Sequence, residues 1–141
     1  MSVSIKNKTR RPLRGRRSFT LAASKALPGW EVSLVFVGPT EAKQLNAKLR
    51  GKTYTPNVLS YVAGTKHGEI IICPTIAERE APEYGHSFQI HLLYLFIHGL
   101  GHLAGRAHGA TMERWEHTLL AQVAGSSGRT LAHESTHRHR H

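Results

Sequence analysis

The sequence predicts an α+β domain with a small mixed β-sheet covered by helices on one side. Three observations favour this class. Strand-like and helix-like segments alternate along the chain, a Gly-containing turn joins two β-branched runs, and the longest apolar run leads straight into a row of histidines. A chain of 141 residues with 40% hydrophobic content can form one domain with a substantial core. We expect that domain over residues 1–124, followed by a basic, His-rich tail over residues 125–141.

The first half of the chain predicts two strand–helix pairs. Residues 3–5 form a short β-run, and residues 32–37 read VSLVFV, which is rich in β-branched residues. A helical pattern follows each run. Residues 18–27 are expected to begin at Ser18 as N-cap, and residues 40–50 to begin at Thr40 and end at Gly51.

The second half predicts a hairpin and the remaining helices. Residues 58–62 and 69–73 read as two strands joined by a tight turn. A helix begins after Pro74, breaks near Gly85 and resumes over residues 87–104. The last helix is expected over residues 110–124. Its core-facing stripe consists of Trp115, Leu119 and Val123, at four-residue spacing.

Cysteine usage and hydropathy bear on the compartment. Cys73 is the single cysteine and lies in an apolar run, so no disulfide partner exists and a reducing cytoplasm is the expected location. The apolar run over residues 90–97 is too short to cross a bilayer, and no membrane association is expected. Arg16-Arg17 weakly resembles a twin-arginine signal, but Lys25 and Pro28 interrupt the apolar region that must follow.

The segment HGLGHLAGRAH carries the predicted metal site. His98 and His102 are four residues apart and therefore share one helix face, about 6 Å apart along the axis. Gly105 can adopt positive φ, end the helix and return His108 to the first two histidines. Three imidazoles leave one coordination position of a tetrahedral zinc ion open, as in catalytic sites. The alternative is that His98 and His102 are hydrogen-bonded core residues and that His108 lies on the surface.

Two further histidines lie near this segment in the sequence. His91 is seven residues before His98, which is about 10.5 Å along a helix and too far for a shared ion at about 2.0 Å per ligand. We therefore interpret His91 as a groove or core residue. His117 lies on the following helix, and its spacing assigns it no role.

The spacing H-x3-H-x2-G-x2-H is that of metzincin peptidases, which carry a general-base Glu directly after the first histidine. Here that position is Gly99, so a zinc metallopeptidase is a disfavoured alternative. A zinc ion that lowers the pKa of a bound water suits a phosphodiester, provided a cation stabilises the charge that develops on phosphorus.

A second zinc pattern lies close to the C-terminus. Residues 133–137 read HESTH, which matches HExxH, with His133 and His137 as the histidines. The pattern lies in a Gly-, Ser- and Arg-rich segment without an apolar face to hold a helix on a core. We interpret it as part of a solvated tail that binds metal adventitiously.

The charge distribution indicates a phosphate-bearing partner. The net charge is +10, and eight Lys and Arg residues precede Glu31, the first acidic residue. Within this block we assign substrate binding to Arg14, Arg16 and Arg17. Together with a site suited to phosphodiesters, the block favours RNA over a merely basic, soluble surface.

Three blocks resemble the YbeY family of rRNA maturation factors, across residues 3–124. They are Leu45-Asn46 with Arg50-Gly51-Lys52, the segment NVLSY followed by GEIII, and the histidine segment followed by Met112-Glu113 and Glu116. The resemblance implies a zinc-dependent endoribonuclease of single-stranded RNA. Its implied roles are the 3′-end processing of small-subunit rRNA and ribosome quality control, with the small ribosomal subunit as partner.

Carried over by position, the resemblance makes His98, His102 and His108 the ligands of one zinc ion, and catalytic together with Arg50. Arg50 would bind a substrate phosphate and stabilise charge on phosphorus. Ser60 would lie beside the groove and hydrogen-bond a substrate or a ligand histidine. The attacking group is expected to be zinc-bound water, with the ribose 2′-hydroxyl left open.

The chain departs from the family pattern at Pro56, Gly101, Arg106 and Ala107, where the family has Thr, Leu, Tyr and Asp. Gly101 lowers helix propensity by about 1 kcal/mol relative to Ala and removes a core side chain. If the Asp orients a ligand, its loss lowers metal affinity by about 10- to 100-fold. The second functional hypothesis is therefore a ribosome-associated RNA-binding factor with structural zinc and weak or no catalysis.

Overall fold

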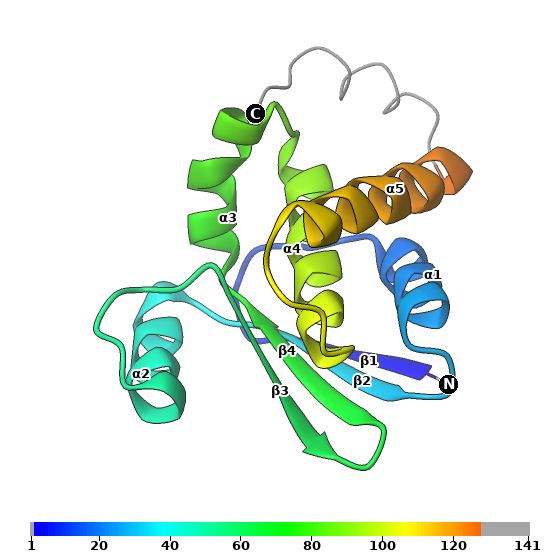
Figure 1. Ribbon diagram of the computed structural model, residues 1–141. Coiled ribbons are helices and arrows are strands. Elements are labelled where there is room, and N and C mark those ends of the chain that lie inside the picture. The colour runs from blue at the N-terminus through cyan, green and yellow to red at the C-terminus, as the bar shows by residue number, and fades with distance from the viewer. Residues whose placement is uncertain (1, 128–141) are drawn as a thin grey trace.

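The computed structural model describes residues 2–127, and its side chains over residues 3–125. Four strands form one sheet in the order β1-β2-β4-β3 (Figure 1). The β1–β2 and β2–β4 pairs are parallel and the β3–β4 hairpin is antiparallel, which confirms the predicted mixed sheet and hairpin. The strands are β1 (Ser2–Asn7), β2 (Glu31–Phe36), β3 (Val58–Gly64) and β4 (His67–Ile72).

The helices follow the predicted order, and the α+β class is confirmed. They are α1 (Arg16–Ala26), α2 (Pro39–Arg50), α3 (Pro74–Glu80), the 3-10 helix η1 (Ala81–Tyr84), α4 (Phe88–Leu103) and α5 (Ala110–Ser127). The predicted break near Gly85 is real. Gly85 has φ 70° and ends η1, and the Ser87 side chain then caps α4 by accepting a hydrogen bond from the Ile90 amide at 3.2 Å.

Two predicted N-caps are wrong. Ser18 and Thr40 lie inside α1 and α2, whose N-cap residues are Gly15 and Gly38. Helix α2 starts at Pro39, because proline's fixed φ suits the first turn and its missing N–H removes no hydrogen bond there. The predicted end of α2 at Gly51 is confirmed: its φ is 68° and its amide donates to the Ala47 carbonyl at 3.0 Å.

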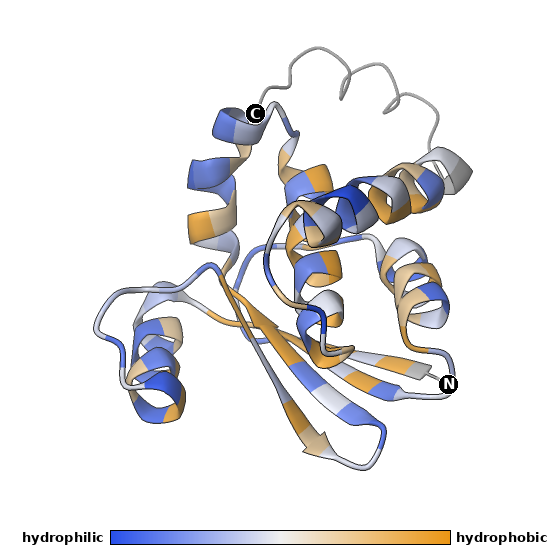
Figure 2. Cartoon of the chain, viewed as in Figure 1, coloured by the Kyte–Doolittle hydropathy of each residue, from blue (hydrophilic) through white to orange (hydrophobic). Residues whose placement is uncertain are grey.

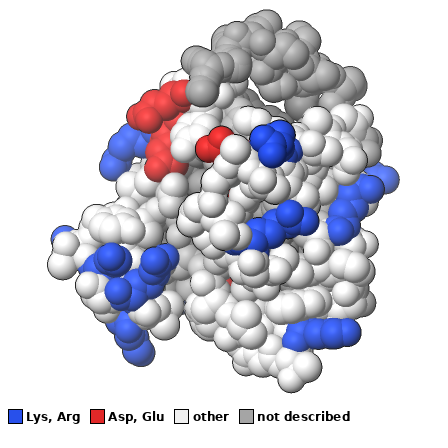
Figure 3. Space-filling view, in the orientation of Figure 1, with Lys and Arg blue, Asp and Glu red and all other residues white. Residues whose placement is uncertain are grey.

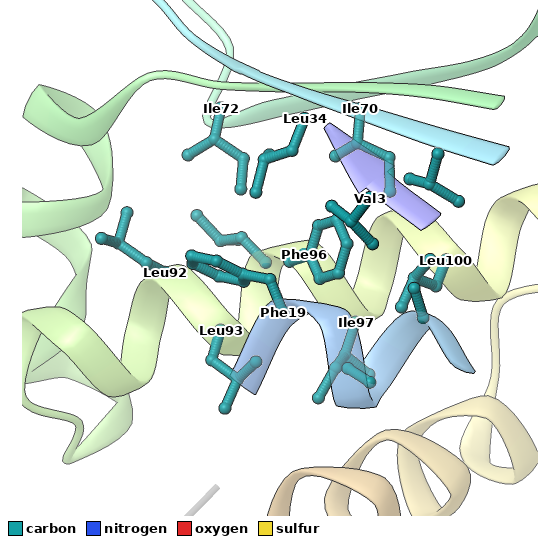
Figure 4. Packing of buried hydrophobic residues seen from close by; sticks show 14 of the residues in the cluster. Val3, Phe19, Leu34, Ile70, Ile72, Leu92, Leu93, Phe96, Ile97 and Leu100 are labelled. Atoms are coloured by element: carbon teal, nitrogen blue, oxygen red, sulfur yellow. The ribbon is translucent and has the colours of Figure 1, made fainter. Parts of the chain in front are cut away.

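The main core lies between one face of the sheet and helices α1, α4 and α5. Figure 4 shows Leu34 and Ile70 on the strands facing Phe19 of α1 and Phe96 of α4. The Phe19 and Phe96 rings meet edge to face, with centroids 5.2 Å apart. Since fully burying a Leu, Ile or Phe side chain stabilises a fold by about 1.5–3 kcal/mol, this packing fixes α4 firmly on the sheet.

The opposite sheet face carries a smaller cluster, so helices do not cover one side alone. Leu59 and Ile71, paired across the hairpin, pack there with Ala42 and Leu45 of α2. Cys73 belongs to this cluster and is 1% exposed, which confirms the prediction of a buried thiol. Figure 2 shows the alternation of hydrophobic and hydrophilic residues along the strands that makes both faces possible.

Helix α5 extends three residues past its predicted end, to Ser127. Leu119 and Val123 are buried as predicted, and Trp115 is partly buried against the same core. The remainder of the predicted tail, including the HESTH pattern at His133 and His137, lies outside the described residues. None of the described helices combines the length and the hydropathy that a membrane-spanning segment requires.

Candidate metal centre

The three predicted ligands, His98, His102 and His108, come together. One ring nitrogen from each lies within 4.8 Å of the other two. The Nε2 atoms of His98 and His102 are 3.1 Å apart, and the ring centroids of His102 and His108 are 4.6 Å apart. Two imidazole nitrogens on a tetrahedral zinc ion are separated by about 3.3 Å, so the donor set fits this ion.

The local fold explains the convergence. His98 and His102 lie one turn apart in the last part of α4, and the helix ends at Leu103. Gly105 then has φ 82° and its amide donates to the His102 carbonyl at 3.0 Å, as the sequence predicted. The chain reverses at this glycine, and His108 reaches the other two imidazoles from an exposed loop.

A carboxylate behind His98 orients its ring. Glu116 of α5 is 2% exposed and accepts a hydrogen bond from His98 Nδ1. A proton held on Nδ1 leaves the lone pair of Nε2 directed at the other histidines. Glu116 was predicted only as part of a sequence motif, and its role appears only when α5 packs on α4.

Tyr94 completes this support. Its ring stacks on His98 with centroids 6.4 Å apart and planes 29° apart. Burial, followed by the negative charge of Glu116, raises the pKa of the Tyr94 phenol well above its ordinary range. The phenol therefore stays protonated beside Glu116. Sequence reasoning missed Tyr94; the available signal was its position four residues before His98 on the same helix face.

The surroundings of His102 favour its neutral form. Burial and then the neighbouring His98 and His108 lower the pKa of His102 below its ordinary value, and the positive charge of Arg50 adds to the lowering. A metal ligand must be deprotonated, so this shift extends metal binding to lower pH.

Arg50 is an exposed residue at the C-terminal end of α2, and its charge reaches His102. Figure 3 shows Lys and Arg gathered over α2. The exposed cations there and in the following loop are Lys43, Lys48, Arg50 and Lys52. From the sequence we assigned substrate binding to the N-terminal arginines and gave these lysines no role, although Lys48 and Lys52 lie close to Arg50 in the chain.

Ser60 lies on the sheet face that α4 covers. It pairs with Ile70 across the hairpin and shares its face. Ile70 in turn contacts Gly99, where an added Cβ would lie 3.1 Å from the Ile70 side chain. Position 99 thus faces the sheet and lacks room for a Glu, which argues further against a peptidase.

Gly101 and Arg106, two positions at which the chain departs from the family pattern, both lie against Trp115 of α5. A Cβ at Gly101 would lie 2.6 Å from Met112 Cε and 2.9 Å from Trp115 Cζ3, so side chains of α5 fill the space that the family's Leu would occupy. Arg106 then covers the Trp115 ring at 4.3 Å. The core side chain that Gly101 lacks is replaced from the neighbouring helix. Ala107, the position of the family's Asp, is exposed in the loop.

The N-terminal arginines lie at the far end of α4. The Arg14 carbonyl accepts a hydrogen bond from Gln89 at 2.8 Å, and Arg16 and Arg17 begin α1 beside it. Gln89 and His102 are separated by thirteen residues of one helix, about 20 Å. The three N-terminal arginines are therefore distant from the histidine cluster, whereas the charge of Arg50 reaches His102.

His91 and His117, the two further histidines weighed in the sequence, lie outside the ligand set. His91 is fully buried, as its interpretation as a groove or core residue anticipated, and its Nε2 lies 3.1 Å from Glu80 Oε1. His117 is exposed on α5.

Known proteins share this sequence and fold. The family model described as endoribonuclease YbeY matches residues 3–124. An endoribonuclease YbeY of Aromatoleum aromaticum is 33% identical over 132 residues, covering 90% of this chain and 84% of the relative. The endoribonuclease YbeY of Rhizobium etli is 41% identical over 107 residues, which cover 66% of this chain and 63% of the relative. The solution structure of TM1509 from Thermotoga maritima has a TM-score of 0.67 at 24% identity, covering 99% of this chain and all of that one. On the extent of the family match, this chain belongs to the endoribonuclease YbeY family.

Proposed function

We propose that the protein is a zinc-dependent endoribonuclease that cleaves single-stranded RNA during rRNA maturation. The single observation that carries the proposal is the convergence of three imidazoles, with the charge of Arg50 reaching one of them, His102. The relatives' name, endoribonuclease, supports the same reaction. By family membership we extend the proposal to the cytoplasm, the small ribosomal subunit, the 3′ end of its rRNA and ribosome quality control.

Each residue of the site has a defined task in this proposal. His98, His102 and His108 hold one zinc ion, which when bound supplies a Lewis acid and a water of lowered pKa. Glu116 fixes the ring of His98. Arg50 pairs with two oxygens of the scissile phosphate and stabilises the charge that grows on them during cleavage. Ser60, beneath α4, hydrogen-bonds the substrate or a ligand histidine.

Two basic regions bind the RNA backbone. The lysines around Arg50 hold the phosphates next to the cut, and Arg14, Arg16 and Arg17 hold a more distant part of the strand. Each phosphate contact that is lost should reduce the slope of log affinity against log salt by about 0.7 on a single strand. Replacing the three N-terminal arginines with Ala should therefore flatten the slope, and an unchanged slope would exclude them from the interface.

The test of the catalytic role is Arg50→Ala in the zinc-loaded protein, with Lys43→Ala as the matched α2 control. Arg50→Ala should lower the cleavage rate by about a hundredfold and RNA affinity much less, because the guanidinium acts mainly as charge develops. Zinc content should be unchanged in both variants. Lys43→Ala removes a phosphate contact but no catalytic charge, so it should weaken RNA binding and leave the cleavage rate at saturating RNA near wild type. Zinc-loaded wild-type protein that binds single-stranded RNA and cuts none would instead establish an RNA-binding factor with structural zinc.

A further inference from the structure

A cluster of aromatic rings runs from the metal centre to the protein surface. Tyr94, stacked on His98, also contacts Tyr84 of η1 at a centroid distance of 5.3 Å and His86 at 5.4 Å. Because the Tyr84–Tyr94 and Tyr94–His98 distances are 5.3 and 6.4 Å, the Tyr84 ring lies within 12 Å of the His98 ring. The metal site thus continues into an aromatic surface over η1 and α4.

The base of this cluster is a buried polar network. His91 is fully buried, and it lies between Tyr84, at 4.7 Å, and Tyr94, at 5.5 Å. Its Nδ1 is 3.0 Å from His86 Nδ1, and its Nε2 is 3.1 Å from Glu80 Oε1. Asn57 donates to both Glu80 oxygens, at 3.1 and 3.2 Å. The network fixes the rings before any ligand arrives, which lowers the entropic cost of stacking on them.

The backbone also fixes the outer ring. Gly85 has φ 70° and donates to the Pro82 carbonyl at 3.1 Å, while the His86 amide donates to the Ala81 carbonyl at 3.0 Å. This tight turn holds Tyr84 and His86 nearly parallel, with planes 26° apart. Tyr84 is nevertheless 46% exposed, so much of its ring remains open to a ligand.

The surrounding charge selects the kind of group that can bind there. Figure 3 shows Asp and Glu side chains gathered over α3, which leads into η1. Burial and then the carboxylates of Glu80 and Glu83 raise the pKa of Tyr84, so negative charge reaches this ring. Arg11 pairs with Glu78 of α3, but Glu80 and Glu83 still bring negative charge to the Tyr84 ring. Like charges repel, so this position disfavours a phosphate, and the flat face of an uncharged base is the fitting group.

We propose that Tyr84 and His86, backed by Tyr94, form a stacking subsite for one unpaired nucleobase next to the bond that is cut. The proposal rests on the proposed RNA substrate. It divides the substrate between two regions: phosphates lie on the α2 cations and the metal centre, and a neighbouring base turns toward η1. A base inside a duplex is stacked on its neighbours and cannot enter, so the subsite selects single strands.

The test combines a Tyr84→Leu variant with RNA strands that each carry one abasic nucleotide, moved stepwise along both sides of the cleavage position. Affinity is measured by fluorescence anisotropy in an Arg50→Ala background, where cleavage is slow, and kcat/KM in the otherwise wild-type chain. Leu keeps His91 covered but offers no π face. The matched control is Tyr61→Leu, an exposed tyrosine of β3 on the opposite face of the sheet.

With Tyr84 present, one abasic position beside the cut should weaken binding by about 5- to 150-fold, the usual range for the loss of one stacked base. Tyr84→Leu should weaken binding of the intact strand by a similar factor. In this variant the abasic position should cause no further loss of affinity, because both changes remove the same contact. Tyr84→Phe and Tyr61→Leu should behave as wild type. Two results would overturn the subsite. One is equal affinity of the protein for all abasic strands; the other is that the losses of affinity from Tyr84→Leu and from the abasic nucleotide multiply, as they do for independent contacts.

This design also separates the subsite from the proposed activity. RNA cleavage without coupling between Tyr84 and any base would sink the stacking proposal alone. Absence of cleavage would sink the nuclease, and the affinities would still decide whether a base stacks on Tyr84.

Discussion

Replacing Glu116 with Gln should weaken zinc binding without removing a ligand. The Glu116 carboxylate is 2% exposed and accepts from His98 Nδ1, so it fixes both the ring and its tautomer. Gln keeps the shape but loses the charge, and its amide can turn either a donor or an acceptor toward the ring. Loss of such a partner typically lowers metal affinity by about 10- to 100-fold, equivalent to about 1.4–2.7 kcal/mol of binding free energy.

Two measurements quantify this loss of zinc affinity. Competition with a chromophoric chelator at neutral pH gives the zinc Kd directly. At a fixed excess of free zinc, the stabilisation that zinc gives to the fold falls by the same free energy, so the difference in Tm between zinc-loaded and metal-free protein should shrink by about 3–10 °C. Using this difference removes any effect of the substitution on the metal-free fold.

The matched control is Glu113→Gln, an exposed carboxylate three residues earlier on α5, which should leave the zinc Kd unchanged. A wild-type Kd in Glu116→Gln would refute the reasoning, provided that His102→Ala abolishes binding in the same assay. The hydrogen bond to His98 would then be without influence on the metal.

Three other outcomes are expected. Gly101→Ala should lower the free energy of unfolding measured in urea. Overpacking against Trp115 costs about 1–3 kcal/mol, which exceeds the gain of up to about 1 kcal/mol in helix propensity. A more stable variant would show that the α4–α5 contact is loosely packed. His102→Ala should abolish stoichiometric zinc binding, whereas joint replacement of His133 and His137 with Ala should retain one zinc per chain; the reverse would move the site to the HESTH pattern. Metal-free protein should lose stability as the pH falls below about 6.5. The pKa of His102 is lowered in the folded state, so the unfolded chain binds its proton first as the pH falls. His102→Asn should therefore reduce the dependence of stability on pH. An unchanged dependence in this variant would contradict the role given to His102.

The metal ligands were predictable from sequence because their arrangement is almost entirely local. The spacing of His98 and His102 and the positive φ of Gly105 are properties of one helix and its end, and they place three donors whatever the rest of the fold does. The mixed sheet, the hairpin and the break at Gly85 followed from the same kind of short-range pattern. The N-cap predictions at Ser18 and Thr40 failed because Gly15 and Gly38 are the N-cap residues and both helices begin earlier in the chain.

The surroundings of the ligands depended on contacts between distant segments, which no local pattern encodes. Glu116 meets His98 only because α5 packs across α4, and that packing is close only because Gly101 leaves room for Trp115. In the sequence, Gly101 indicated a weakened helix and a lost core side chain. In the fold it is the point where two helices approach, since the absence of a Cβ becomes an advantage when a neighbouring ring fills the space. The sequence by itself determined which atoms can hold the metal, and the tertiary structure decided which groups orient those atoms and which surfaces lie beside them.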